Sequence, residues 1–234
     1  MKKNIQIGFL ATALVILITS AKTDSASRET RKVEGFSKIS LSISADVYLE
    51  QGKEFKVEVE ADEDDLEKII TEVTGDELRI KNKNWHDNLG KSTIYITMPE
   101  INGVSVSGSG SVSAKSSVKT SDLDLTISGS GSIYFDDLSS QEMKARITGS
   151  GNINCSGKDK ASMLYTEITG SGNFNGNKFV AEKVEVRITG SGKANVHATS
   201  NLNTEITGSG DVNYAGNPKV NANTTGSGKT RSMN

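Results

Sequence analysis

The chain has 234 residues, of which 34% are hydrophobic and 5% aromatic, and its formal net charge is −2. This composition is typical of a folded protein, and the small net charge argues against a nucleic-acid-binding surface, which needs a basic patch. The 23 glycines and 2 prolines favour many short strands and tight corners over thick helical layers.

The N-terminus predicts an export signal over residues 1–21. Lys2 and Lys3 form its positive end, an apolar run extends from Ile7 to Ile18, and small residues suit cleavage after Ala21. The run is shorter than the roughly 20 residues that a membrane-spanning helix needs, so we expect no membrane span after signal cleavage. The predicted location is therefore extracytoplasmic: the periplasm, the outer surface or the secreted fraction.

The stretch 22–34 is polar and without period, which predicts a flexible leader. Residues 35–103 predict a β-rich portion, because apolar and polar residues alternate over 39–49, 55–59, 78–80 and 94–98. Apolar residues at helical spacing after Asp62 to Asp65 predict one short helix near 64–73, with acids that complement its dipole.

Two features of this portion suggest binding sites, and each has a simpler interpretation. The acids at 62–65 resemble calcium ligands, but their spacing does not match a calcium loop, so a solvated helix turn is favoured. Trp85 beside His86 could stack on a sugar ring, and the alternative is a Trp folded back onto the sheet.

The dominant feature of the chain is the triplet Gly-Ser-Gly, which occurs seven times in residues 104–234 at steps of 18 to 21 residues. A fixed period near 20 residues predicts a stacked repeat, and the period-two alternation before each triplet makes the repeat unit a β-strand. We therefore expect an all-β fold, a single-stranded right-handed parallel β-helix-like solenoid that continues from residues 35–103. The repeat glycines are Gly108, Gly110, Gly129, Gly131, Gly149, Gly151, Gly170, Gly172, Gly190, Gly192, Gly208, Gly210, Gly226 and Gly228. We expect them to permit a corner or a close approach of opposing walls.

Stacking the repeats in register places outward residues in columns. One column has charges of alternating sign at four successive rungs, and its members are Arg146, Glu167, Arg187 and Glu205. Opposite charges on adjacent strands attract, so we interpret this charge ladder as a marker of the register.

Several motifs resemble known chemical sites but lack residues that those sites require. We therefore expect no catalytic, cofactor-binding or metal-binding residues. Gly226 to Thr230 matches the end of a P-loop, but the first glycine and the following helix of that motif are missing, so no nucleotide site is expected. The dinucleotide pattern Gly-x-Gly-x-x-Gly fails because its last position holds Ser113, Tyr134, Asn154, Asn175, Asn195, Asn213 or Arg231. Cys155 is the only cysteine, and its position in a strand predicts a small buried side chain rather than a nucleophile.

These residues leave three hypotheses for function. The first is a non-enzymatic module that binds an unknown surface, glycan or protein ligand. The second is a carbohydrate-active enzyme whose paired acids are Asp136 and Asp137 or Asp122 and Asp124, because glycoside hydrolysis needs two carboxylates. The third is an envelope scaffold that assembles end to end. An aromatic strip on the surface would favour glycan binding, and one acidic cleft would favour an enzyme.

The chain resembles the head GIN domain family of putative auto-transporter adhesins over nearly all of its mature length. The resemblance rests on Val33 to Ile39, Asp46 to Leu49, Tyr95 to Glu100 and the repeated Gly-Ser-Gly-Asn/Ser-Ile. It implies an exported, all-β solenoid on or near a Gram-negative cell envelope with an adhesive role.

Overall fold

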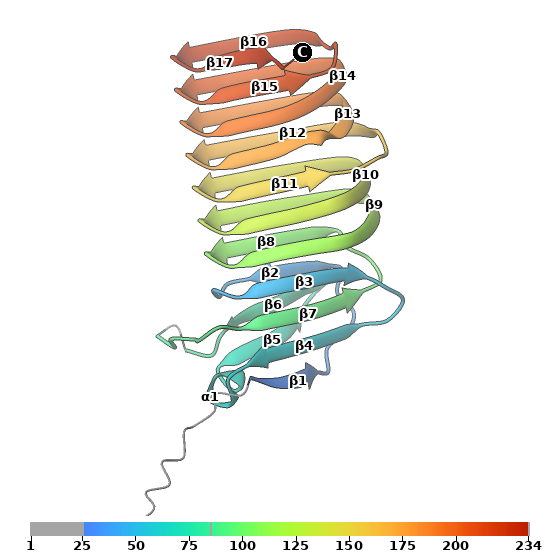
Figure 1. Ribbon diagram of the computed structural model, residues 1–234, viewed down its shortest axis with the longest axis vertical. Coiled ribbons are helices and arrows are strands. Elements are labelled where there is room, and N and C mark those ends of the chain that lie inside the picture. The colour runs from blue at the N-terminus through green and yellow to red at the C-terminus, as the bar shows by residue number, and fades with distance from the viewer. Residues whose placement is uncertain (1–25, 85, 234) are drawn as a thin grey trace, which may run out of the picture.

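The structure is a computed structural model that describes residues 26–84 and 86–233, so the expected signal at 1–21 lies outside the described residues. It is almost all β, with 71% of the described residues in strands and 2% in helix. The chain winds into a β-solenoid of about 6 turns with rungs of about 20 residues (Figure 1). The fold class predicted from the repeat is confirmed.

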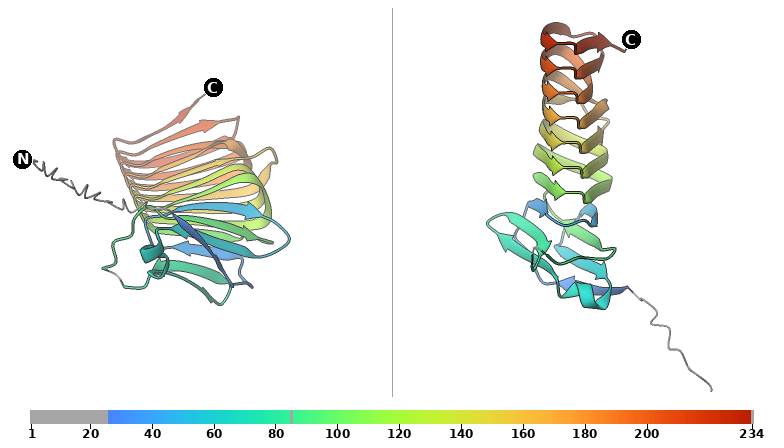
Figure 2. Two further views of the ribbon diagram at one scale, coloured as in Figure 1. Left: turned by 60° about the horizontal axis from the view of Figure 1, so that its bottom comes forward. Right: turned by 90° about the vertical axis from the view of Figure 1, so that its left-hand side faces the viewer.

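The flattened coils have two faces, which are visible edge-on in Figure 2. We call entry face the sheet whose strands end at the triplets, and exit face the sheet whose strands begin after them. The strands of the repeat are β8 (Gly103–Gly108), β9 (Ser111–Gly129), β10 (Ser132–Gly149), β11 (Asn152–Ser156), β12 (Ala161–Gly170), β13 (Asn173–Gly190), β14 (Lys193–Gly208), β15 (Asp211–Ala215), β16 (Lys219–Gly226) and β17 (Lys229–Ser232). The long strands β9, β10, β13 and β14 start on the exit face and continue, round the corner opposite the triplets, onto the entry face.

Along each strand the alternation directs every second side chain, usually an apolar one, into the inside of the coil. Ile127 pairs in register with Ile147, and the same column continues through Ile168, Ile188 and Ile206, all 1% exposed or less. Because the side-chain period of a strand is two, a slip of one residue would move this column to the surface, so the core specifies the register.

The two glycines of each triplet serve different purposes. The first has a φ angle between 108° and 127° in all seven copies, a region that residues with a Cβ atom rarely adopt. The second lies against the previous rung: a Cβ on Gly151 would stand 2.5 Å from Cγ2 of Ile127 and 2.7 Å from the carbonyl oxygen of Gly131. The expected corner is thus present at the first glycine, whereas the close approach is between neighbouring rungs rather than opposing walls, and from the second copy onward it involves the first glycine as well.

The N-terminal coils are not stacked in chain order. The coil formed by β2 (Lys38–Leu41) and β3 (Asp46–Gln51) lies between the coil of β6 (Glu77–Asn82) and β7 (Thr93–Met98) and the first coil of the repeat. The chain therefore leaves this coil, forms the end of the rod, and returns past it to begin β8 (Figure 1). The Gln51 side chain links the returning segment to the repeat, because its Nε2 donates to the carbonyl oxygen of Pro99 at 3.1 Å and to that of Lys119 at 2.9 Å.

Antiparallel strands complete the N-terminal end of the rod. On the exit face β4 (Lys56–Ala61) pairs with β7, and β1 (Ser27–Arg31) pairs with β4. On the entry face β5 (Ile69–Thr74) pairs with β6. The predicted flexible leader is thus wrong for residues 27–31: a polar strand at a sheet edge needs no apolar face, and Arg28 forms an ion pair with Glu60 at 2.5 Å across the two strands.

The predicted helix near 64–73 is also wrong over most of its length. Only α1 (Glu63–Leu66) is helical among the described residues, and Ile69 begins strand β5. The β-branched residues of β5 favour a strand, and Gly75, with φ 64°, turns it directly into its partner β6. The hairpin therefore prevails over the helical spacing of a few apolar residues.

Candidate functional site

A column of uncharged side chains runs along the exit face. Tyr48 is the register partner of Tyr95 on one side and of Ser113 on the other. From Ser113 the column continues, one residue per rung, through Tyr134, Asn154, Asn175, Asn195 and Asn213. We call these eight residues the tyrosine–asparagine column.

The tyrosines form an aromatic platform at the N-terminal end of this column. The ring centroids of Tyr48 and Tyr95 are 5.6 Å apart and their planes differ by 24°, the geometry of an offset pair that leaves part of each ring uncovered. The guanidinium of Arg28 lies 4.3 Å from the centroid of the Tyr95 ring. Tyr48 is 42% exposed and Tyr134 is 38% exposed, so large apolar surfaces face solvent here.

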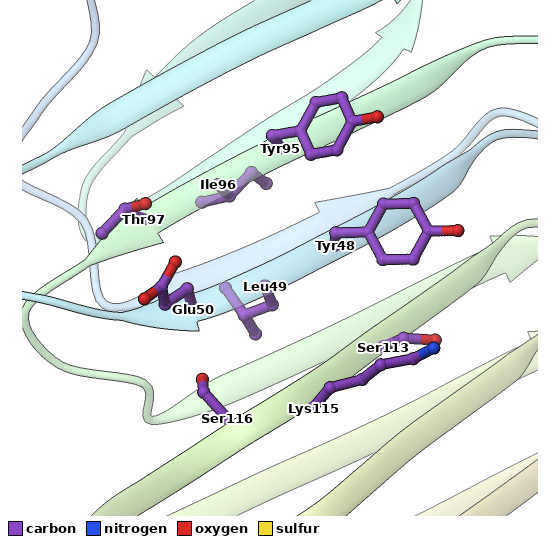
Figure 3. A pocket seen from close by; sticks show the side chains of 9 residues that line it. All are labelled: Tyr48, Leu49, Glu50, Tyr95, Ile96, Thr97, Ser113, Lys115 and Ser116. Carbon is purple, nitrogen blue, oxygen red and sulfur yellow. The ribbon is translucent and has the colours of Figure 1, made fainter.

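A pocket of about 330 Å³ adjoins the platform (Figure 3). Its walls include Tyr48, Tyr95 and Ser113, with Lys115 and Glu50 at its border. Figure 3 shows both tyrosine rings pointing the same way along their strands, with the Lys115 side chain on the neighbouring rung. This volume is at the lower end of the range of about 300–1,000 Å³ for small-molecule sites. The pocket thus combines an aromatic wall with hydroxyl, ammonium and carboxylate groups.

Asparagine amides continue the column beyond the tyrosines. Nδ2 of Asn213 donates to Oδ1 of Asn195 at 2.9 Å, and Nδ2 of Asn175 donates to Oδ1 of Asn154 at 3.4 Å. A primary amide has two donors and can accept twice, so these bonds leave hydrogen-bonding capacity directed at solvent. The amides form a regular surface with one group per rung.

The charge ladder lies on the opposite side of the rod, on the entry face. Register partners are Arg146 with Glu167, Glu167 with Arg187, and Arg187 with Glu205. Arg146 Nε lies 3.8 Å from Glu167 Oε2, and Arg187 Nε lies 3.6 Å from Glu205 Oε2. Tyr165 sits beside the ladder and donates to Glu167 at 3.1 Å. Burial raises the pKa of the Tyr165 phenol, and its bond to Glu167 acts in the same direction. These groups neutralise one another across exposed rungs.

The acids considered for catalysis lie in two places. Asp122 and Asp124 line a polar pocket of about 560 Å³ together with the acids Asp76 and Glu100 and the cations Lys38 and Lys119, and Asp124 lies 3.9 Å from Arg146. Asp137 belongs to another rung, at an irregularity of β10, and lies 3.9 Å from the ammonium of Lys158. A cation therefore already engages one acid of each proposed pair.

Cys155 and Asp65, two other candidates from the sequence, are both buried. The Cys155 side chain is 4% exposed, and burial raises the pKa of its thiol, so the reactive thiolate is disfavoured. Asp65 of the acidic cluster is engaged by Lys68 at 2.6 Å and by the Gly90 amide at 2.7 Å. Within residues 26–84 and 86–233 no group of three or more His, Cys, Asp or Glu side chains could hold a metal ion. Trp85 lies outside the described residues.

The tyrosine–asparagine column was not predicted from the sequence, although most of its members occupy one fixed position of the repeat. They are the residues that break the dinucleotide pattern three places after each triplet, from Ser113 to Asn213. The available signal was their lack of charge at six successive rungs. Tyr48 and Tyr95 could not be added from the repeat, since they precede it and join the column only through the out-of-order stacking of the N-terminal coils.

Comparison with protein families gives a match over residues 35–218 to the family described as putative auto-transporter adhesin, head GIN domain. The chain belongs to the head GIN domain family. A comparison with curated proteins gave no match. The described residues hold no helix long and apolar enough to cross a membrane.

Solved structures share the head GIN fold of this chain. A putative adhesin from Bacteroides fragilis has a TM-score of 0.85 at 23% identity, covering 90% of this chain and 98% of its own. A putative adhesin from Parabacteroides merdae and a putative lipid binding protein from Parabacteroides distasonis each have a TM-score of 0.75 at 23% identity. Each of the two covers 91% of this chain and 98% of its own. At this identity the likeness concerns the fold alone.

Proposed function

We propose that the protein is an exported, non-enzymatic binding module of the cell envelope whose exit face binds carbohydrate. The observation that carries the proposal is the stacked pair of exposed Tyr48 and half-buried Tyr95, beside a pocket lined by hydroxyl and charged groups. A pyranose ring has an apolar face of C–H groups and a polar rim of hydroxyls. Tyrosine rings pack against such a face, while Ser113, Lys115 and Glu50 reach the rim.

The location and the adhesive role rest on different support. The predicted signal at residues 1–21 supports export. The family description and the two related structures named putative adhesins support a role in attachment to a surface. One related structure is named a putative lipid binding protein, and lipid is therefore the competing ligand class that the experiment includes.

The absence of enzymatic activity is part of the proposal. A glycosidase needs one acid held protonated and a second carboxylate free to act. Asp124 lies 3.9 Å from Arg146 and Asp137 lies 3.9 Å from Lys158, so one acid of each candidate pair already has a cationic partner.

The test is a binding measurement on the mature protein with immobilised neutral and acidic glycans and with phospholipid vesicles. Tyr48→Ala is expected to weaken glycan binding about tenfold, because it removes one stacking surface worth about 1.4 kcal/mol. The matched control is Tyr165→Ala, which removes a tyrosine from the entry face and is expected to leave binding unchanged. Folded protein that binds no glycan, or binds one equally well after Tyr48→Ala, would contradict the proposal. Binding to vesicles alone would assign the protein to lipid instead.

A further inference from the structure

We infer that the ligand of the exit face is a neutral, unbranched polysaccharide that lies along the axis of the rod, over the whole tyrosine–asparagine column. This inference rests on the proposed function and adds the class and direction of the ligand. It extends the site from the pocket beside Tyr48 to Asn213, a residue six rungs away in the register.

The direction follows from the dimensions of the exit face. Across the face a strand such as β11 offers three outward residues, Asn152, Asn154 and Ser156, which span about 13 Å. Along the axis the eight residues of the column span about 34 Å at about 4.8 Å per rung. A ligand that lies across the face meets one member of the column, whereas a ligand along the axis meets three tyrosines and four asparagines. The axial direction therefore provides far more contact for the same width of ligand.

The spacing of the column suits a sugar polymer. One rung is close to the length that one pyranose unit adds to an extended β-linked chain, so successive units can meet successive rungs. Tyr48 offers a ring surface for the first units, with the part of Tyr95 that Arg28 and Tyr48 leave uncovered, and the amides of Asn154, Asn175 and Asn195 offer donors and acceptors for the hydroxyls that follow. A coiled α-linked chain would follow the straight column over only a few rungs.

The charge pattern selects a neutral chain. No member of the column is charged from Tyr95 to Asn213, and the flanking columns carry both signs. On one side Asp46 lies near the N-terminal end of the column, while Lys193 and Asp211 lie on adjacent rungs near its other end; on the other side Glu50 and Lys178 lie at different rungs. A polyanion or polycation would meet repulsion from one sign on each flank, while a neutral chain meets none.

The first measurement needs no variant: calorimetric titration of the wild-type protein with xylo-oligosaccharides and N-acetylated chito-oligosaccharides, from the disaccharide to the octasaccharide. We expect affinity to rise through the series up to the octasaccharide in at least one of these β-linked families. Malto-oligosaccharides, which coil, serve as the control and are expected to gain little beyond the trisaccharide. Affinity that stops rising at the trisaccharide in both β-linked series would overturn the axial arrangement.

The second measurement compares two asparagines of strand β14. Asn195→Ala removes an amide of the column, about 24 Å from Tyr48, and is expected to weaken octasaccharide binding about threefold to tenfold without changing trisaccharide binding. Asn203→Ala is the matched control, because Asn203 lies on the same strand but on the entry face. Melting temperatures of both variants show whether the side-chain hydrogen bond between Asn195 and Asn213 also contributes to the stability of the fold. Equal octasaccharide affinity of Asn195→Ala and wild type would contradict the inference.

The outcomes separate this inference from the proposed function. Short sugars that bind in a Tyr48-dependent way, without gain from chain length, would keep the proposed function and reject the axial polysaccharide. Binding of vesicles or protein through Tyr48 in place of any sugar would reject both the ligand class and its direction. No Tyr48-dependent binding of any probe would reject both proposals.

Discussion

The backbone of Gly170 lies so close to Gly149 on the previous rung that a Cβ atom on Gly170 would stand 2.5 Å from the Gly149 carbonyl oxygen. The φ angle of Gly170 is 116°, which L-residues rarely adopt. The amide of Ser171 donates to the same carbonyl at 2.9 Å, so the contact belongs to the corner that joins the two rungs. Close rung-to-rung contact and a left-handed backbone therefore coincide at one residue.

Gly170→Ala should consequently destabilise the protein. The new methyl group meets backbone atoms that cannot move without breaking the corner, and the required φ is itself strained, so a loss of at least about 2 kcal/mol is expected. Chemical denaturation monitored by circular dichroism measures this loss. The control Ser171→Ala changes an exposed side chain of the same triplet and should stay within about 0.5 kcal/mol of wild type. Equal stability of the two variants would show that the close contact does not hold the corner.

Thr166→Val should stabilise the rod. The Thr166 hydroxyl is fully buried and finds no hydrogen-bond partner among the described residues, while its register partners are Ala145 and Val186. Valine has the same shape without the unsatisfied polar group, so a gain of about 1 kcal/mol is expected.

The control for this substitution is Thr204→Val in the same inward column. The Thr204 hydroxyl shares a hydrogen bond of 2.8 Å with Thr230, so its loss leaves Thr230 without that bond and should lower stability. If denaturation curves shift in the same direction for both variants, the hydroxyl of Thr166 is not the cause of the effect.

The Asp65–Lys68 pair should make stability depend on pH. The hydrogen bond from Lys68 lowers the pKa of Asp65, with a second contribution from the Gly90 amide, and the bond to Asp65 raises the pKa of Lys68. A lowered carboxyl pKa adds stability that is present above the unfolded pKa of about 3.9 and disappears as pH falls through the lower folded pKa. The raised pKa of Lys68 adds stability below about pH 10.4 that is lost as pH rises through the folded pKa.

Asp65→Asn should therefore flatten the acid side of the stability profile. Melting temperatures between pH 7 and pH 3, measured for wild type and variant, test this directly. Asp64→Asn, in the same helical turn, is the control and should keep the wild-type slope. A slope for Asp65→Asn as steep as that of wild type would assign the acid sensitivity to other groups.

Arg187→Glu should lower the melting temperature in a salt-dependent way. Arg187 contacts Glu185 at 2.8 Å and is the register partner of both Glu167 and Glu205, and its pKa is raised chiefly by the Glu185 carboxylate. The substitution places carboxylates at three successive rungs, and added salt screens their repulsion because these groups are exposed. Arg187→Gln removes the attraction without adding repulsion and should show a smaller loss. A loss that persists unchanged in high salt would point to packing rather than charge.

Local periodicity was sufficient to predict the solenoid. The alternation of apolar residues and the regular triplets determine which side chains are buried and how equivalent residues stack, because every rung repeats the same local solution. The register of Ile127 with Ile147 follows from that repetition. The two short-range errors, in the leader and after α1, arose where a few residues were compatible with more than one local structure and distant partners decided between them. Residues 27–31 form strand β1 because they pair with strand β4, where Arg28 forms an ion pair with Glu60.

The sequence by itself determined an all-β rod with about 20 residues per coil, the glycine corners and the alternation of inward and outward side chains, because all of these depend on neighbours within one repeat. Only the tertiary structure decided that the coil of Tyr48 lies between the coil of Tyr95 and that of Ser113. Strand β3 finds β7, which is distant in the sequence, because both bury apolar faces in the same core, and no local pattern specifies that choice. The aromatic end of the tyrosine–asparagine column thus exists only after the chain has folded back past its own first coil.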